Sequence, residues 1–288
     1  TPEEQDIRDG LVSSFRRSEK LQIHTRFLYS VGSIYRRHNG NLLYHGCIPC
    51  DGNGEFMEFS LYSDTPLKGR AFLDWADRLA RQGYFAPDGS MERLRGLDFL
   101  WFLWCGRNSP ICGRTKITTF ERALIEDKAS YTEPKNPYYV YYGSEEFCRR
   151  ILDDFDLHKP WSRIINGHMP VKVKEGEDPR KGGGRLVVID GGFCKAYHKQ
   201  TGIAGYTMFF SSHGMRIAAH EPFTTREEAI HGKKDITSHS FIVENLPRRL
   251  MISDTDAGEG IKRRIEDLNA LLDAYRSGTI KTDSTGRI

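Results

Sequence analysis

The chain lacks three features that would assign its class at once: a long apolar run, an excess of one charge, and a dense, regular cysteine pattern. No apolar run approaches the roughly twenty residues of a membrane helix, so we expect no membrane segment. The 42 Lys and Arg residues almost balance the 39 Asp and Glu residues, which argues against a nucleic-acid partner. Six irregularly spaced cysteines among 288 residues favour free thiols and a reducing, cytoplasmic location.

Several catalytic signatures are also missing. The chain has no Gly-x-Ser-x-Gly elbow, which excludes a typical serine hydrolase, and no P-loop. It has no internal repeat and no low-complexity linker. What is present is 38% hydrophobic content, enough for a core in one large domain or two smaller ones.

The N-terminal segment has helical apolar spacing. We predict helix over the first forty residues, with Gly40 as the stop signal. An apolar run from Asn41 then predicts a strand that ends at His45, and a second strand is expected at about 56–61. The expected order is strand, polar loop, strand.

The remaining chain alternates in character. Helical spacing predicts a helical layer or insertion at about 70–130, the aromatic segment 132–143 predicts extended structure, and Ser144 is placed to cap a helix over 144–157. Short apolar runs then predict strands at 163–167, 185–192, 205–212, 214–223 and 239–247, several of which can pair as hairpins in one sheet. An amphipathic helix is expected at 258–278. The pattern indicates an α/β fold with mixed order.

Two histidines stand at the ends of apolar runs beside glycine, His45 in "LLYHG" and His168 in "IINGHMP". A strand end fixes an imidazole ring, and glycine lets backbone and ligand approach closely. Both positions therefore suit a metal ligand, and both also suit an ordinary turn histidine.

A basic, glycine-rich segment follows at 177–185. It sets Arg180, Lys181 and Arg185 around three glycines, a combination that can bind a phosphate or form a solvated hairpin loop. A second candidate segment contains Asp190 and Lys195 beside two further glycines, and its alternative is a β-bulge with a basic turn.

Cysteine and histidine pairs offer weaker candidates. Cys47 and Cys50 form a C-x-x-C, but without a second close pair we predict small buried thiols in place of zinc or redox chemistry. His213 and His220 flank an expected strand, and we predict turn histidines there.

Several segments together closely resemble the class III fructose-1,6-bisphosphatases of bacteria, in the order of that family. They are 18–49, 118–128, 135–139, 164–214 and 220–223. The resemblance runs from about Ser18 to the last helix. It implies the C-terminal half of a calcineurin-like metallophosphoesterase sandwich, with a mixed, largely antiparallel sheet and the helical layer or insertion.

That superfamily's site takes two metal ions from five motifs. His45-Gly46 is similar to the fourth motif, and Gly167-His168-Met169-Pro170 to the fifth. The resemblance thus favours metal binding at both histidines, on the same ion. The metal it implies is Mn²⁺ or Mg²⁺, in a dinuclear centre in the intact enzyme.

The first three motifs do not appear in their expected places, and no Gly-Asp dipeptide occurs in the chain. Asp156-Leu157-His158 matches D-x-H only by chance, after the fourth motif. We therefore expect residues 1–288 to be the C-terminal part of one catalytic domain. We expect the catalytic residues in an N-terminal portion of the same enzyme.

The resemblance implies a gluconeogenic enzyme in which a metal-activated hydroxide removes the C1 phosphate of fructose 1,6-bisphosphate. On chemistry alone, Arg180, Lys181, Arg185 and Lys195 are candidates to bind the substrate's phosphates. We also expect a homo-oligomer. The alternatives are another calcineurin-like phosphoesterase, acting on dinucleoside polyphosphates or phosphoproteins, and a non-catalytic module completed by a partner chain.

Overall fold

The structure is a computed structural model of the 288-residue chain. It describes residues 1–192, 201–202, 205–221, 225–232 and 238–281. Lys195 lies outside these ranges. The chain forms two compact units, which are described separately: unit 1 comprises 1–36 and 45–141, and unit 2 comprises 37–44 and 142–288.

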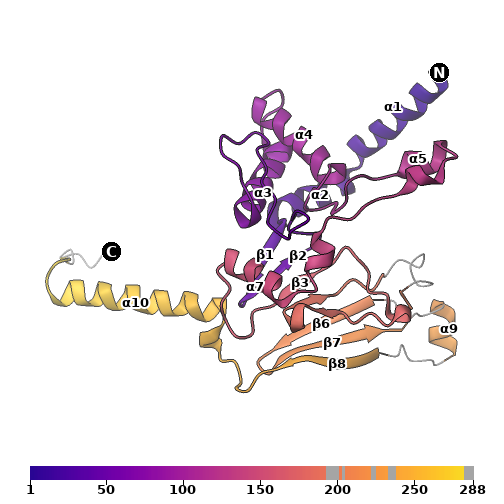
Figure 1. Ribbon diagram of the computed structural model, residues 1–288. Helices are drawn as coiled ribbons and strands as arrows, with labels where there is room; N and C mark the ends of the chain where they lie inside the picture. The colour runs from indigo at the N-terminus through magenta and orange to yellow at the C-terminus, as the bar shows by residue number, and fades with distance from the viewer. Residues whose placement is uncertain (193–200, 203–204, 222–224, 233–237, 282–288) are drawn as a thin grey trace. The chain divides into compact units, whose positions relative to one another are not determined.

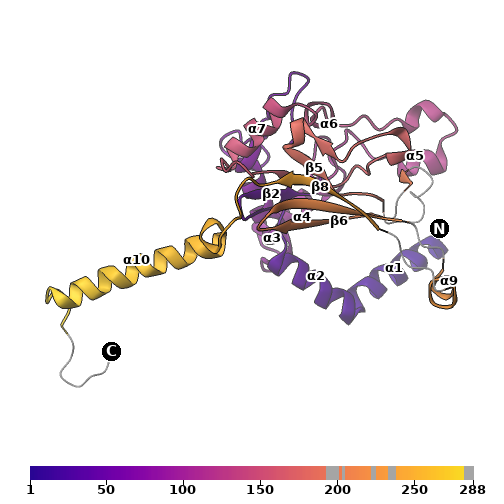
Figure 2. The same ribbon diagram turned by 90° about the horizontal axis from the view of Figure 1, so that it is seen from below.

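Unit 1 begins with two helices, α1 (Pro2–Arg17) and α2 (Glu19–Val31), which meet at Ser18 (Figure 2). Ser18 ends the first helix, and its hydroxyl accepts a hydrogen bond from the Leu21 N–H at the start of the second. Neither helix contains a buried residue. The predicted apolar stripe of α2 is therefore exposed in this chain.

The predicted helical layer at about 70–130 contains α3 (Gly69–Phe85) and α4 (Met91–Cys105), which lie side by side (Figure 1). Phe72 and Phe99 are buried between aromatic neighbours, and Gly83 and Gly96 meet where the helices cross. The shorter elements of unit 1 are α5 (Thr119–Leu124), η1 (Lys128–Tyr131) and α6 (Tyr138–Tyr141). Extended structure was predicted for 132–143, and this prediction is wrong at α6, because Pro137 starts a helical turn there.

The N-terminal helical prediction was too long. After α2 the chain forms β1 (Tyr35–His38) and turns back through Asn39 and Gly40 into β2 (Asn41–Tyr44). Both turn residues have positive φ, 49° and 82°, as a two-residue hairpin turn requires. Gly40 is therefore a hairpin residue and not a helix stop.

The first sheet of the structure has five strands in the order β1-β2-β3-β5-β4, completed by β3 (Ile164–Asn166), β4 (Arg180–Lys181) and β5 (Leu186–Val188). Its three central strands are parallel, and the register aligns Tyr44, Asn166 and Val188. The predicted mixed sheet is thus confirmed, although its centre is parallel where a largely antiparallel sheet was expected. A crossover of more than a hundred residues joins β2 to β3, which permits parallel pairing.

A second, antiparallel sheet contains β6 (Gly205–Ser211), β7 (Gly214–His220) and β8 (Ser238–Asn245), close to the predicted positions. Glu244 of β8 forms an ion pair with Arg163, just before β3, with side chains only 16% and 12% exposed. Burial lowers the pKa of the Arg163 guanidinium. Removing either partner would leave a largely buried charge without its counterion.

The remaining elements of unit 2 are helical: α7 (Glu145–Asp154), η2 (Val173–Glu175), η3 (Gly182–Gly184), α9 (Arg226–His231), η4 (Ile252–Asp254) and α10 (Asp256–Arg276). The Ser144 cap and the C-terminal helix agree with the predictions. Among the described residues, no helix is both long and apolar enough to cross a bilayer.

Gly96→Ala tests the helix crossing of unit 1. An added Cβ would overlap the Gly83 backbone, which cannot rotate away, so we expect a loss of about 1–3 kcal/mol in the free energy of unfolding. Gly10→Ala in α1 is the matched control, since a Cβ there meets nothing within 4 Å. Urea denaturation of both variants measures the difference. A Gly96→Ala protein as stable as the control would contradict the crossing.

Candidate functional site

The carboxyl ends of β2, β3 and β5 lie at one edge of the five-stranded sheet, which is the usual ligand edge of parallel strands. Hydrogen bonds from the side chain and to the backbone of Asn166 join these strand ends. The Asn166 amide donates to the Tyr44 carbonyl at 3.2 Å, and the Ile189 N–H donates to the Asn166 carbonyl at 2.9 Å. Asn166, only 1% exposed, was missed by the sequence analysis, although a polar residue that ends the apolar run "IIN" is a usable signal.

His168 stands two residues beyond β3, at this edge. Its φ of 67° is left-handed, a conformation that costs a non-glycine residue about 1–2 kcal/mol. The Met169 N–H donates to the Gly167 carbonyl at 2.8 Å, and the Val171 N–H donates to the Asp190 carbonyl at 2.9 Å. The surrounding hydrogen bonds therefore hold a half-buried histidine in a strained turn, which is common at functional sites.

His45 follows Tyr44 directly in the chain and is exposed. The next residue must be glycine, because a Cβ on Gly46 would overlap the carbonyl of Pro110. The Cys47 N–H donates to that carbonyl at 2.8 Å. The division between the units falls between Tyr44 and His45, so each candidate histidine is placed within its own unit.

A metal needs more ligands than these histidines supply. No group of three or more His, Cys, Asp or Glu residues able to hold a metal occurs in the described part of the chain. Two neutral imidazoles without a carboxylate suit Mn²⁺ or Mg²⁺ poorly, because both ions prefer oxygen ligands. The described residues alone therefore do not fit a metal centre, and no catalytic step through a metal follows from them.

The first two basic candidates lie on the edge strand β4. Arg180 and Lys181 are neighbours in this strand, so their side chains leave opposite faces. Asp178 lies 2.7 Å from the Arg180 guanidinium, whose hydrogen bonds lower the pKa of that carboxyl, and Glu177 lies 2.7 Å from Lys181 Nζ. Both cations are thus paired, and they do not converge on one anion.

Arg185 lies beside this pair in the backbone, because Lys181 of β4 pairs with Leu186, the residue that follows Arg185. Arg185 precedes β5, at the amino-terminal edge of the parallel strands, about 10 Å along the strand from the carboxyl edge. Lys195 lies outside the described residues. The hairpin thus brings the backbones of Lys181 and Arg185 close together, while their side chains pair with different carboxylates, Glu177 and Glu145.

The glycine triplet of this segment has a packing role. Gly182 is buried, and a Cβ there would lie 2.5 Å from Cys148 Sγ on α7. A Cβ on Gly183 would lie 2.9 Å from a carboxylate oxygen of Glu145. Both glycines have positive φ. Their small size thus lets the loop pack against the start of α7.

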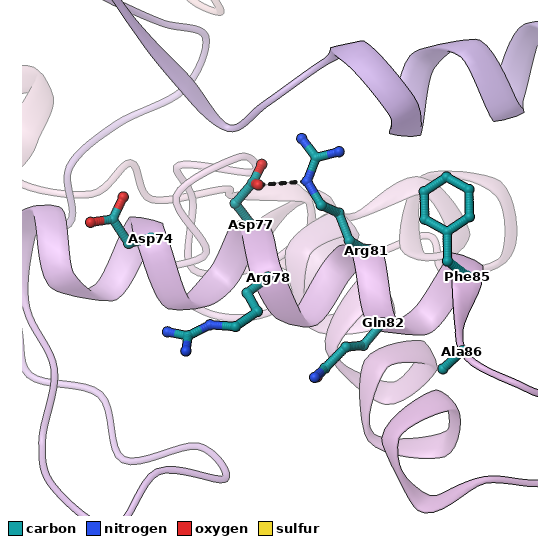
Figure 3. A pocket seen from close by; sticks show the side chains of 7 residues that line it. All are labelled: Asp74, Asp77, Arg78, Arg81, Gln82, Phe85 and Ala86. Carbon is teal, nitrogen blue, oxygen red and sulfur yellow. Dashed lines mark hydrogen bonds and ion pairs between the residues drawn. The ribbon is translucent and has the colours of Figure 1, made fainter. Parts of the chain in front are cut away.

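A hollow with a volume of about 480 Å³ lies along α3 in unit 1 (Figure 3). Its lining comprises Asp74, Asp77, Arg78, Arg81, Gln82, Phe85 and Ala86. Arg81 pairs with Asp77 at 2.7 Å and donates to the carbonyls of Tyr29 and Gly32 at the end of α2. The Arg81–Asp77 ion pair therefore holds the C-terminal end of α2 in place.

The weaker candidates behave as structural residues. Cys47 and Cys50 are buried free cysteines, and burial raises the pKa of the Cys47 thiol. His213 lies in the turn between β6 and β7, as predicted. His220 lies inside β7, where its ring hydrogen bonds to Thr207 and Ser238 of the neighbouring strands.

Thiol labelling tests this assignment. At neutral pH we expect Cys105, which is partly exposed, to react with iodoacetamide far faster than Cys47, Cys50 and Cys148. Burial raises the pKa of Cys148 to about 12, so little thiolate is available there. Peptide mass spectrometry gives the rates, and urea should equalise them. Fast labelling of the C-x-x-C pair, or zinc retained by it, would contradict the structural role.

The comparisons with known proteins agree with one another. The family described as "Firmicute fructose-1,6-bisphosphatase" matches residues 1–277. "Fructose-1,6-bisphosphatase class 3" of Clostridium botulinum (strain 657 / Type Ba4) is 50% identical over 285 residues, which cover 99% of this chain and 42% of that protein. The protein of the same name from Clostridioides difficile (strain 630) is 48% identical over 281 residues, 98% of this chain and 42% of that protein.

The chain thus spans less than half the length of the curated relatives it matches. No solved structure gives a significant match. Because the family match covers almost the whole sequence, the chain belongs to the Firmicute fructose-1,6-bisphosphatase family.

Proposed function

We propose that this chain is part of an enzyme that hydrolyses the C1 phosphate of fructose 1,6-bisphosphate, giving fructose 6-phosphate and phosphate. The family match over residues 1–277 carries this proposal. The names of relatives at about half identity over 98–99% of the chain support it. Gluconeogenesis is the role that this reaction implies.

We further propose that His45 and His168 bind one ion of a Mn²⁺ or Mg²⁺ centre in a calcineurin-like fold. The similarity of His45-Gly46 and Gly167-His168-Met169-Pro170 to two motifs of that superfamily supports this assignment. The remaining ligands, an asparagine and aspartates, would come from a portion of the enzyme outside this chain. The incomplete ligand set of the described residues is consistent with such a division.

The assignment of Arg180, Lys181, Arg185 and Lys195 to the substrate's phosphates stays a prediction. The two cations of β4, Arg180 and Lys181, would have to exchange their present carboxylate partners for the phosphate. For a part-exposed pair this exchange costs little, because such ion pairs contribute about 0–1 kcal/mol.

Association with further chains is also proposed. Five exposed apolar residues of α10 follow one another at alternating spacings of four and three, the pattern of a coiled-coil seam. They are Ile261, Ile265, Leu268, Leu272 and Tyr275. This pattern supports a homo-oligomer. The free thiols support a reducing, cytoplasmic location.

The second candidate function is a non-catalytic module that a partner chain completes. The absence of a full metal-ligand set from the described residues favours it for this chain taken alone. Co-purification of a second polypeptide that carries the missing motifs would support it. Activity in one longer chain that includes these 288 residues would exclude it.

Phosphate release in the full-length protein tests the proposed reaction. With Mn²⁺ present, His45→Ala and His168→Ala should each lower kcat by at least ~100-fold, because a lost ligand weakens metal binding. His213→Ala is the matched control, since this turn histidine lies in a different sheet and should leave kcat unchanged. The 288-residue chain alone should be inactive.

Two outcomes would contradict this account. Activity of the 288-residue chain with both histidines replaced would show that neither is a ligand. The full-length protein could instead cleave a dinucleoside polyphosphate or a phosphoprotein in preference to fructose 1,6-bisphosphate. That result would contradict the proposed substrate and would be compatible with the proposed metal site.

A further inference from the structure

A small polar pocket lies in unit 2, at the amino-terminal edge of β3 and β5. Its volume is about 170 Å³. Its lining comprises Arg149, Leu152, Asp153, Leu157, His158, Lys159, Pro160, Ser162 and Arg185. Three cationic side chains thus face one acidic side chain, with a histidine beside them.

Glu145 positions two of these cations. One of its carboxylate oxygens accepts from Arg149 Nε at 3.1 Å and from a terminal nitrogen at 2.6 Å, and Arg185 Nε lies 3.7 Å from the same oxygen. Hydrogen bonds from Arg149 and, less strongly, the charge of Arg185 lower the pKa of the Glu145 carboxyl. The carboxylate therefore stays ionised and holds both guanidinium groups.

Each guanidinium keeps a further nitrogen available. Arg185 donates through one terminal nitrogen to the Pro160 carbonyl at 3.2 Å, and its other terminal nitrogen bonds to none of the described residues. Within the same described part of the chain, the second terminal nitrogen of Arg149 has no partner. Arg185 is only 22% exposed, so its unused donor is largely shielded from water.

The segment 158–162 completes the pocket. His158 Nδ1 lies 3.1 Å from Asp153, which leaves Nε2 available. Lys159 Nζ lies 2.9 Å from Glu259 and 5.6 Å from the ring centroid of Trp161. Its charge therefore remains close to the pocket, although Glu259 partly offsets it.

Ser162 gives the second, independent sign of a ligand. The residue is 1% exposed, and its hydroxyl finds no hydrogen-bond partner among the described residues. A buried hydroxyl without a partner costs about 1–3 kcal/mol, so such groups are rare unless a ligand or water completes them. Ser162 lines the same pocket as the cations.

We propose that this pocket binds the phosphoryl group of a small phosphate compound, as a site separate from the proposed metal centre. Arg185 and Ser162 precede β5 and β3, about 10 Å along these strands from the carboxyl edge. The volume corresponds to roughly five or six waters, which accommodates phosphate and excludes a buried nucleotide. This proposal assigns Arg185 a role that does not depend on the proposed reaction.

Phosphate titration of the 288-residue chain tests the site. Inorganic phosphate should bind saturably in the millimolar range in calorimetry at constant ionic strength, and should shift the His158 ring signals in NMR. Arg149→Gln and Arg185→Gln should each weaken binding by at least ~10-fold, because a charge-assisted hydrogen bond is lost. Arg150→Gln is the matched control, since this arginine also lies on α7 but does not line the pocket.

Ser162→Ala separates ligand binding from a structural role. Because the hydroxyl has no partner in the described protein, the variant should melt at the same or a higher temperature without phosphate. It should nevertheless lose most of the stabilisation that phosphate gives the parent chain. A variant that is destabilised without phosphate, yet binds it normally, would overturn the assignment.

Two further outcomes are decisive. Absence of saturable phosphate binding in the parent chain, or equal affinities in the Arg149, Arg185 and Arg150 variants, would reject the site. A second titration with glycerol 3-phosphate identifies the source of the phosphoryl group. Tighter binding than inorganic phosphate indicates a phosphorylated organic compound, and equal binding indicates free phosphate.

Discussion

The parallel register of β2, β3 and β5 is the constraint on which the rest of the account depends. It aligns Tyr44, Asn166 and Val188 and so places three strand ends at one edge. The buried Asn166 amide ties two of these ends together. A shift of one residue in this register would turn each buried side chain to the other face, so the hydrophobic core itself fixes the edge from which both candidate histidines follow.

The two edges of this sheet have different chemistry. The carboxyl edge continues into a strained turn at His168. The amino edge has Arg185 and Ser162 beside the cations of α7 and the segment that follows it. Glycines that accept close backbone or side-chain contact, such as Gly46 and Gly182, fix the loops that leave these edges.

Local patterns predicted local elements well. The strand from Asn41, the Ser144-capped helix and the C-terminal strands follow from apolar period and capping chemistry. The strand β1 was missed because "YRRH" carries no apolar alternation, and only the Asn39-Gly40 turn indicates it. Parallel pairing of β2 with β3 was missed because no local signal spans so long a crossover.

Local sequence patterns were also insufficient to identify the candidate sites. The metal role of the histidines came from the family resemblance, since their spacing alone allowed ordinary turns. Asn166 and the phosphate pocket depend on segments far apart in the sequence, which only the tertiary structure unites. Arg185 illustrates the consequence: the sequence grouped it with Arg180 and Lys181, and the fold pairs its guanidinium with Glu145 on α7 while the other two cations pair with Asp178 and Glu177.

Paramagnetic broadening by Mn²⁺ tests most directly whether the carboxyl edge is the metal edge. In amide NMR spectra of the full-length protein, added Mn²⁺ should broaden first the signals of His45, Gly46, Gly167 and His168. The signals of Arg149, His158 and Arg185 should remain sharp at the same Mn²⁺ concentration. Broadening that begins at the amino edge, or that leaves both histidines unaffected, would contradict the account.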